Sequence, residues 1–315
     1  MKILITGSSG FIGYHLADEL LKRKYDIIGI DNNNNYYPSI IKKKRLKKLK
    51  KNKKFRFYKL NLINKKKLEK IFIKHKPDII FHLAGQPGVL YSIKYPKTYT
   101  TNNVYATKSI CKISKKHNVK KFIYGSSSSV YGDQEKFPIK ENFKLNPKNP
   151  YALTKLKSEN IVKEEFKKSS TKYIIFRFFT VYGPFGRPDM FIHKFLNSIK
   201  KNKKIKLYNN GLNFRDFTYI KDVVKILSKI IKVFPVSRVI NICRSKPIKT
   251  THLVSLIKKF YRENYQFTNT GFVKGEMLKT HGSNKLLKKN FKNIKFTDIK
   301  IGLKKTILAF KKYGY

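Results

Sequence analysis

Tyr151 and Lys155 have the types and the spacing of a proton-transfer pair. They lie four positions apart in a segment that predicts a helix, so both side chains lie on one face of it. A lysine ammonium beside a phenol lowers the pKa of the phenol, and the resulting tyrosinate can take a proton from a substrate hydroxyl. In a chain with 20 tyrosines and many lysines this spacing also arises by chance, so the interpretation depends on the surrounding motifs.

A glycine-rich turn near the N-terminus is typical of a dinucleotide site. Gly7, Gly10 and Gly13 form the pattern GxxGxxG between a predicted strand at residues 2–6 and a predicted helix at 11–24. Glycines there allow a tight turn and let backbone N–H groups approach a pyrophosphate, which the positive end of the helix dipole favours. By itself the turn could be merely structural.

Asp31 strengthens the interpretation of the glycine-rich turn as part of a dinucleotide site. It follows the second predicted strand, 18 residues after Gly13, where a carboxylate can accept hydrogen bonds from both hydroxyls of an adenosine ribose. The same negative charge would repel a 2′-phosphate. The glycine turn and this carboxylate together predict NAD, rather than NADP, as the cofactor.

A row of hydroxyl side chains lies between these motifs in the sequence. Four serines, Ser126 to Ser129, follow a predicted strand at 121–125 and precede the sequence VYG. Ligands of open parallel sheets bind at the carboxyl ends of the strands, which is where this row should lie. We therefore expect substrate contacts there, with a serine-rich loop that binds nothing as the alternative.

Short apolar strands and amphipathic helices alternate through the first half of the chain and must position these motifs. The predicted strands are 2–6, 25–30, 55–60, 78–83, 121–125 and 173–178. The predicted helices are 11–24, 64–75, 98–117 and 151–167. Such alternation is typical of a parallel sheet with helices on both faces. The sequence predicts an α/β fold with a Rossmann-like, doubly wound parallel sheet.

The regular alternation ends after Phe179, where glycines and prolines crowd residues 183–188. Later elements are predicted at 189–201 (helix), 205–208 (strand), 220–232 (helix) and 239–243 (strand). We predict an NAD-binding domain at 1–179, to which the chain returns at about 216–243. Residues 180–315 should mainly form a smaller substrate-binding lobe.

Charge is the most unusual feature of the composition. Lys and Arg number 72 against 18 Asp and Glu, a formal net charge of +54. Such a field attracts nucleic acids, anionic membranes and phosphorylated ligands, so a polyanion-binding protein is a competing class. The lysines extend from Lys2 to Lys312, which favours a bias of the whole sequence over one binding patch.

The densest basic block spans Lys42–Lys54. Ile41, Leu46 and Leu49 recur there at roughly helical spacing. This pattern predicts a helix whose apolar residues are buried and whose basic residues form a solvated face.

Other features of the composition narrow the class. With 41% hydrophobic residues the chain can bury a core, which argues against a disordered protein. Cys111 and Cys243 are the only cysteines, so we predict no disulfide framework and no metal site. We expect no signal segment, because the apolar run at the N-terminus is too short for one, and no run approaches the roughly 18 apolar residues of a membrane span. We expect a cytoplasmic protein with no membrane partner and no specific nucleic-acid partner.

Taken together, GxxGxxG, the segment SSSSVYG and the YxxxK pair resemble, in this order and spacing, the extended short-chain dehydrogenase/reductase family, specifically its nucleotide-sugar epimerases. The resemblance covers essentially the whole chain. The segments at 82–92, 177–190 and 215–223 look most like those of UDP-glucuronate 4-epimerases. Leu90 and Lys274–Glu276 depart from that pattern, since the closest relatives carry Arg and Pro-Gly-Asp there.

The resemblance implies a cycle without net redox change. Tyr151 removes the proton from the sugar O4 while C4 gives a hydride to NAD, the 4-keto sugar rotates, and the hydride returns to its other face. The catalytic residues would be Tyr151, Lys155 and Ser127, with the Ser127 hydroxyl bonded to O4. Arg187 and Arg215 would contact the diphosphate or the sugar, because guanidinium groups pair with phosphate and carboxylate oxygens.

The predicted cofactor contacts extend beyond the glycine turn and Asp31. They are Gly7, Gly10, Phe11, Ile12, Gly13, Asp31, Asn32, Asn61, Leu62, Leu83, Ala84, Asn103, Tyr151 and Lys155. His82 is interpreted as a structural residue. The resemblance also implies a homodimer, formed through the helices at 98–117 and 151–167.

The predicted substrate is a UDP-uronate. Ser128, Ser129 and Thr180 would hold the C6 carboxylate through hydroxyl and backbone N–H groups, and related decarboxylases carry Glu where Ser129 stands. A 4,6-dehydratase is disfavoured because it needs an acid pair at the positions of Ser128 and Ser129. A UDP-glucose/UDP-galactose 4-epimerase, or another nucleotide-sugar enzyme of the family, remains the alternative enzyme.

Overall fold

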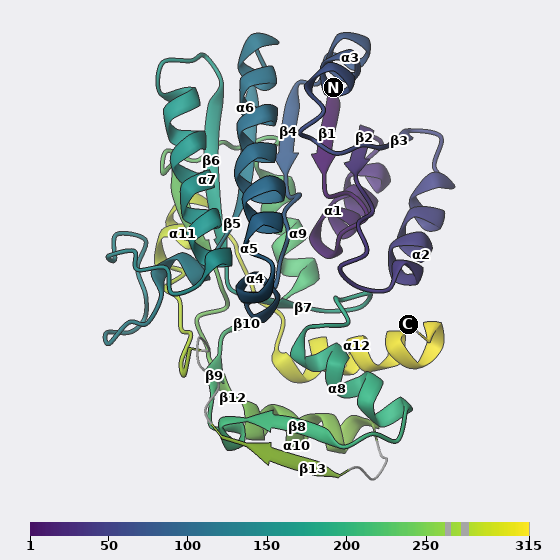
Figure 1. Cartoon of the computed structure of the whole chain (residues 1–315), viewed down its shortest axis with the longest axis vertical. Helices are drawn as coiled ribbons and strands as arrows, with labels where there is room; N and C mark the ends of the chain where they lie inside the picture. Colours follow the sequence, from purple (N-terminus) through teal and green to yellow (C-terminus); the bar gives the residue numbers. More distant parts are fainter. Residues whose placement is uncertain (262–265, 272–276, 315) are drawn as a thin grey trace.

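A parallel sheet forms the centre of the protein. The computed structural model describes residues 1–261, 266–271 and 277–314. Seven strands lie in the order β11-β6-β5-β4-β1-β2-β3, and each is parallel to its neighbours. They are β1 (Lys2–Thr6), β2 (Asp26–Asp31), β3 (Phe55–Lys59), β4 (Ile79–His82), β5 (Lys121–Ser127), β6 (Lys172–Phe178) and β11 (Val239–Ile242). Their carboxyl ends face the smaller lobe (Figure 1).

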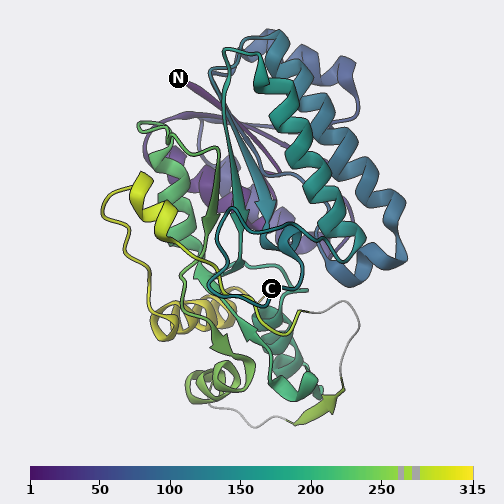
Figure 2. The same cartoon turned by 90° about the vertical axis from the view of Figure 1, so that its left-hand side faces the viewer.

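Helices cover both faces of this sheet. One face carries α1 (Phe11–Lys22), α2 (Ser39–Lys50) and α9 (Ile220–Lys229), and the other carries α3 (Lys65–His75), α6 (Ala106–Lys116) and α7 (Pro150–Lys167). Figure 2 shows the sheet between these two layers. Strands covered on both faces need continuous apolar runs, which explains why all four residues of β4 are buried.

The smaller lobe continues from the carboxyl edge of the sheet. It contains β7 (Thr180–Tyr182), α8 (Phe191–Lys200), β8 (Ile205–Tyr208), η3 (Asn209–Gly211), β9 (Phe214–Arg215), β10 (Phe217–Tyr219), β12 (Ile248–Lys249), α10 (Thr250–Tyr261), β13 (Phe267–Thr270) and α12 (Ile299–Tyr313). Two-stranded pairs replace the large sheet here: β7 with β10, β8 with β13 and β9 with β12. The short helix α11 (Lys285–Asn290) returns to pack against β11.

The predicted fold class and the positions of the predicted strands and helices are confirmed. The predicted helix at 98–117 comprises α5 (Pro96–Tyr99), a wider π-type turn η1 (Thr100–Tyr105) and α6. Two further short elements are α4 (Val89–Lys94), in the connection after β4, and η2 (Ser128–Tyr131), which contains the end of the serine row. None of the helices in the described part of the chain is both long and apolar enough to span a membrane.

The interpretation of the basic block as a solvated face is wrong in part. Ile41, Leu46 and Leu49 of α2 are buried, as their spacing predicts. Lys42 and Arg45 are buried as well, with 6% and 0% of their surface exposed. Their side chains find oxygen acceptors in the loops that α2 packs against, contacts that helical periodicity does not reveal.

Candidate active site

The glycine turn joins β1 to α1 in a conformation that side chains would obstruct. Gly7 has a φ of 71°, and a Cβ on Gly13 would lie 2.2 Å from the carbonyl oxygen of Gly7. Gly10 is the N-cap of α1, and the first turn of this helix carries no acidic residue. Phe11 and Ile12 follow as its first residues. The turn therefore fits an anion held by backbone N–H groups at the positive end of the helix dipole.

Asp31 lies beside this turn. Its carboxylate accepts hydrogen bonds from Ser9 N at 3.2 Å and from Asn33 N at 2.8 Å. The nearby ammonium of Lys42 interacts favourably with the Asp31 charge, which opposes the lowering of the Lys42 pKa by burial. Asn32, the next predicted contact, donates from its side chain to Asn102 at 3.4 Å.

The remaining predicted cofactor residues also lie at the carboxyl edge. Asn61 and Leu62 follow β3, and the Asn61 side chain accepts a hydrogen bond from Ile63 N at 3.3 Å. Leu83 and Ala84 follow β4, where Ala84 N donates to the Thr6 hydroxyl at 3.1 Å.

Asn103 lies in η1 and bridges two other parts of the site. Its Oδ1 accepts from Gln86 N at 2.6 Å, and its Nδ2 donates to the Thr154 hydroxyl at 3.0 Å. These bonds connect the loop after β4 to α7. The predicted contact of Asn103 with a cofactor stays a prediction.

Helix α7 places the predicted proton-transfer pair at the end of β5. Asn149 caps the helix by accepting from Ala152 N at 2.9 Å, so Tyr151 lies in the first turn and Lys155 in the second. Lys155 Nζ donates to Gly125 O at 2.5 Å and lies 4.5 Å from the ring centre of Tyr124. Burial lowers the pKa of Lys155 to about 7.

The Ser127 side chain lies close enough to the Tyr151 hydroxyl to lower the pKa of the phenol. Burial raises the pKa of Tyr151, while the nearby Ser127 hydroxyl and the charge of Arg187 lower it. The net direction is upward, opposite to the lowering expected from Lys155. Burial outweighs the other effects, and the Lys155 ammonium is directed at a carbonyl oxygen.

The serine row turns sharply at the end of β5. Ser127 ends the strand, and both Ser129 N, at 3.2 Å, and Ser129 Oγ, at 3.0 Å, donate to its hydroxyl. Ser126 faces the other way and donates at 2.5 Å to Glu159, which also forms a buried ion pair with Arg177. Ser128 is partly exposed at the start of η2.

Thr180 lies next to this row because Ser127 is the register partner of Phe178 in the neighbouring strand. The backbone N–H of Thr180 donates to Asp216 O at 3.1 Å, which leaves its hydroxyl as the donor available to a ligand. The backbone N–H of Ser129 is also occupied. The backbone N–H groups of Ser129 and Thr180 and the Ser129 hydroxyl are therefore engaged within the protein, and the expected carboxylate contacts of this row stay a prediction.

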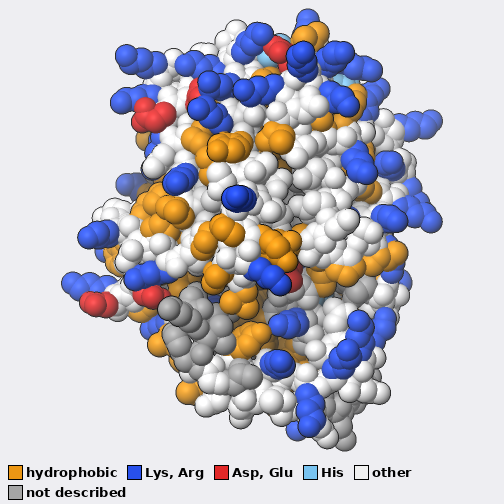
Figure 3. Space-filling model, viewed as in Figure 1, with side chains coloured by type: hydrophobic (Ala, Val, Ile, Leu, Met, Phe, Trp, Pro, Cys, Tyr) orange, Lys and Arg blue, Asp and Glu red, His pale blue; other side chains and the backbone are white. Residues whose placement is uncertain are grey.

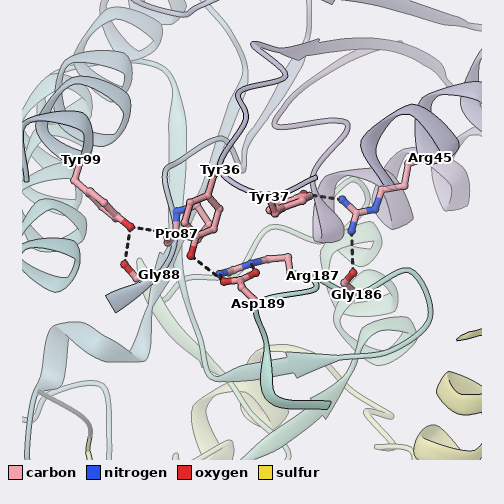
Figure 4. Close-up of polar contacts among 9 residues, drawn as sticks. All are labelled: Tyr36, Tyr37, Arg45, Pro87, Gly88, Tyr99, Gly186, Arg187 and Asp189. Carbon is pink, nitrogen blue, oxygen red and sulfur yellow. Dashed lines mark hydrogen bonds and ion pairs between the residues drawn. The ribbon is translucent and has the colours of Figure 1, made fainter. Parts of the chain in front are cut away.

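Arg187 reaches the region of Tyr151 from the segment between β7 and α8. Its guanidinium pairs with Asp189 at 2.5 Å, and Asp189 accepts a further hydrogen bond from Tyr36 at 2.9 Å (Figure 4). Arg187 lowers and Asp189 raises the pKa of Tyr151. Asp189 and Tyr36 were not predicted from the sequence, although Asp189 lies only two positions beyond Arg187.

Arg215 lies in β9 of the smaller lobe. Its Nη1 donates to Phe214 O at 3.0 Å and to Leu278 O at 3.2 Å. Lys274–Glu276, which depart from the pattern of the UDP-glucuronate 4-epimerases, lie outside the described residues. Leu90 is exposed in α4.

Two buried groups support the site from behind. His82 lies between the hydroxyls of Thr6 at 2.7 Å and Thr107 at 3.0 Å, and burial lowers its pKa to about 3, as suits a neutral structural residue. Asp216 accepts hydrogen bonds from the backbone N–H groups of Arg244, Ser245 and Gly282, yet burial raises its pKa to about 6. The sequence analysis did not single out Asp216 as a site residue. The one indication in the sequence was that it directly follows Arg215.

Comparison with known proteins places the chain among nucleotide-sugar enzymes. The profile of the NAD dependent epimerase/dehydratase family matches residues 3–243. The UDP-glucuronate 4-epimerase of Thermodesulfobacterium geofontis is 33% identical over 307 residues, covering 96% of this chain and 94% of that protein.

Solved structures with ligands are similar over the whole chain. The UDP-glucuronic acid 4-epimerase from Bacillus cereus, in complex with UDP-glucuronic acid and NAD, has a TM-score of 0.93 at 30% identity, covering 99% of both chains. The UDP-glucose 4-epimerase of Thermotoga maritima with UDP-glucose has a TM-score of 0.90 at 26% identity, covering 100% of both chains. Because both are so similar in fold, the choice between a uronate and a neutral sugar depends on the side chains of the site.

Proposed function

This chain belongs to the NAD dependent epimerase/dehydratase family, and on that premise we propose that it is an NAD-dependent UDP-sugar 4-epimerase that interconverts UDP-glucuronate and UDP-galacturonate. The observation that carries the proposal is the closeness of the Ser127 side chain to Tyr151, whose pKa it lowers, at the carboxyl edge of the sheet. It brings a proton-transfer group and a hydroxyl to one place, with Lys155 one turn further along α7.

The glycine turn, Asp31 and Lys155 would hold the cofactor. Backbone N–H groups around Gly7, Gly10 and Gly13 suit the pyrophosphate, Asp31 suits the adenosine ribose, and Lys155 suits the nicotinamide ribose. NAD, when bound, accepts a hydride from the sugar C4 and returns it.

Tyr151 and Ser127 handle the proton of the sugar hydroxyl. In its ionised form Tyr151 takes the proton from O4, and the Ser127 hydroxyl orients that oxygen. Burial opposes ionisation of Tyr151, whereas the charge of Arg187 and the nearby Ser127 hydroxyl favour it. When the 4-keto sugar has rotated, the neutral Tyr151 returns the proton to O4, so no net proton or redox change remains.

Hydroxyl groups distinguish a uronate from a neutral sugar in this proposal. Ser128 and Thr180 would donate to the C6 carboxylate, and Ser129 would join them once its hydroxyl turns from Ser127, since hydrogen bonds to a charged acceptor are stronger than bonds between neutral groups. Ser129 supplies no carboxylate to assist loss of CO₂ from a 4-keto uronate. We assign the cofactor to residues 1–179 and about 216–243, and the UDP-sugar mainly to 180–315, with Arg187 and Arg215 as its cationic contacts.

We further propose that two copies of the chain associate through the face formed by α4, η1 and α7. Large apolar side chains are exposed there: Leu90, Ile93, Tyr95, Tyr105 and Leu153. Figure 3 shows hydrophobic side chains gathered near the middle of this face. An apolar patch of this kind marks an interaction site. Light scattering should find a dimer, and substitution of Tyr105 and Leu153 by Lys should give a monomer.

The experiment that tests the activity is incubation of the purified protein with UDP-glucuronate, followed by chromatographic separation of the products. We expect UDP-galacturonate, little or no UDP-pentose, and much slower conversion of UDP-glucose. Equal or faster conversion of UDP-glucose would make a neutral-sugar epimerase the correct function. Absence of turnover together with salt-sensitive DNA retention would favour the polyanion-binding alternative.

A further inference from the structure

Arg45 is a fully buried cation that has no carboxylate partner in the described part of the chain. Its Nη1 donates to Ser9 O at 2.8 Å and to the Tyr37 hydroxyl at 2.9 Å. Its Nη2 donates to Phe185 O at 2.5 Å and to Gly186 O at 3.3 Å. Figure 4 shows the guanidinium between Tyr37 and Gly186. One side chain thus satisfies oxygens from three separate segments.

Two of those segments belong to different halves of the proposed site. Ser9 lies within the glycine turn, between Gly7 and Gly10, where the cofactor pyrophosphate is assigned. Phe185 and Gly186 directly precede Arg187, whose charge acts on Tyr151. We call residues 183–189 the substrate arm. Arg45 therefore connects the cofactor turn to the backbone that carries Arg187.

A second contact also joins the cofactor side of the site to the substrate arm. His15 of α1, the helix that begins at the glycine turn, donates from Nε2 to Pro184 O of the substrate arm at 2.8 Å. Burial lowers the pKa of His15 to about 3, so the ring is neutral. The neutral ring donates to Pro184 O when its proton is on Nε2. The arm is thus held from the cofactor side by side chains of both α1 and α2.

The energetics of Arg45 favour concerted movement of the two segments. The Nε of Arg45 is buried without a hydrogen-bond partner, so its charge depends on the four bonds made by Nη1 and Nη2. Each further lost partner would leave another charged donor unsatisfied. If the glycine turn or the substrate arm moved alone, Arg45 would lose one set of carbonyl acceptors. Fixing one segment with a ligand therefore fixes the other.

We propose that Arg45 is a positioning residue that couples binding of NAD to binding of the UDP-sugar. The proposal rests on the proposed function, because it requires both ligands. NAD on the glycine turn fixes Ser9, and Arg45 then holds Phe185 and Gly186 in place. Arg187 is thereby positioned before the UDP-sugar binds, so binding of the sugar loses no further conformational entropy in the substrate arm. By linkage, the UDP moiety must strengthen NAD binding by the same factor.

The test is the ratio of NAD dissociation constants without and with saturating UDP, which binds without turnover. It is measured by equilibrium dialysis of the full-length protein, with NAD quantified enzymatically. Allosteric coupling factors are typically about 5 to 150, so we expect UDP to strengthen NAD binding at least about fivefold in the wild type. Arg45→Met should bring the ratio to about 1, and Arg45→Lys should give an intermediate value, because one ammonium cannot span both sets of carbonyls.

Lys47→Met is the matched control, since Lys47 is an exposed cation on the same helix. It should leave the ratio unchanged. If Arg45→Met does not fold, Tyr37→Phe removes one of the four hydrogen bonds while retaining the ring, and its ratio should fall between the wild-type value and 1. A merely structural role for Arg45 would weaken each ligand separately and leave the ratio intact.

Two results would overturn the coupling: a wild type that binds both ligands with a ratio of 1, or an Arg45 variant that binds both and retains the wild-type ratio. A wild type that binds neither NAD nor UDP would instead refute the proposed function. The two failures are therefore distinguishable in one set of measurements.

Discussion

Tyr151→Phe is the most informative single substitution, because it removes one hydroxyl and retains the ring. The hydroxyl lies near Ser127, whose Oγ accepts hydrogen bonds from the N–H and the hydroxyl of Ser129 and keeps both in the variant. The ring also keeps its edge-to-face contact with Tyr99, at 6.1 Å between ring centres. No buried donor is left unsatisfied, so the free energy of unfolding should change by no more than about 1 kcal/mol.

The catalytic loss should be much larger than this loss of stability. General acid–base groups contribute about 10² to 10⁴ in rate, which corresponds to about 2.7 to 5.4 kcal/mol in activation free energy. The assay is steady-state conversion of UDP-glucuronate, with NAD content and UDP binding measured on the same preparation. We expect both ligands to bind nearly as in the wild type.

Tyr99→Phe is the control, since this neighbouring hydroxyl donates to the carbonyl oxygens of Pro87 and Gly88 (Figure 4). Its rate should stay within about tenfold of the wild type, below the range for a proton-transfer group. If Tyr151→Phe kept more than about a tenth of the wild-type rate, the assignment of Tyr151 as the proton-transfer group would be wrong.

Four further perturbations test the site and its support. Asp31→Ala should lower the preference for NAD over NADP at least about tenfold, or about 1.4 kcal/mol, in competitive binding; purification of the wild type with mainly NADP would contradict this. Thr180→Val should raise the KM for UDP-glucuronate at least about tenfold and leave the rate on UDP-glucose unchanged, and equal effects on both sugars would remove Thr180 from carboxylate binding. Glu159→Gln breaks the ion pair with Arg177, in which the Glu159 side chain is 0% and the Arg177 side chain 3% exposed. The free energy of unfolding, measured with denaturant, should fall by about 3 to 5 kcal/mol, and a fall below about 1 kcal/mol would show that the pair does not stabilise the fold. Burial raises the pKa of Asp216 from 3.8 to about 6, so its contribution to stability is fully present below pH 3.8 and is lost as the pH rises through about 6. Relative to Asp216→Asn, the wild type should lose up to about 3 kcal/mol of unfolding free energy over this window, and parallel pH profiles would refute the assignment.

Much of the sheet domain could be predicted because its signals are local. The strand at 2–6, the glycine turn and the following helix depend on apolar periodicity and on glycine conformations within about 20 residues. Tyr151 and Lys155 share a face through helical spacing alone. The order of strands in a doubly wound sheet then brings the carboxyl ends together, which placed the serine row and Thr180 at one edge.

The pKa of Tyr151 was the clearest failure of reasoning from local residues. Four-residue spacing predicted a lysine that lowers it, but in the folded chain Lys155 donates to Gly125 O and burial dominates. Burial is a property of everything packed around a group, and no pair of residues determines it.

The sequence by itself determined the class of fold, the glycine turn and the helical pair proposed to transfer the proton, because each depends on residues close together along the chain. Only the tertiary structure decided which cations are buried. Arg45 stands among lysines that look alike in the sequence, yet the carbonyl oxygens that accept from it lie 36, 140 and 141 positions away, at Ser9, Phe185 and Gly186. A buried charge is stabilised by oxygens that folding brings to it from distant segments, and local periodicity carries no record of them.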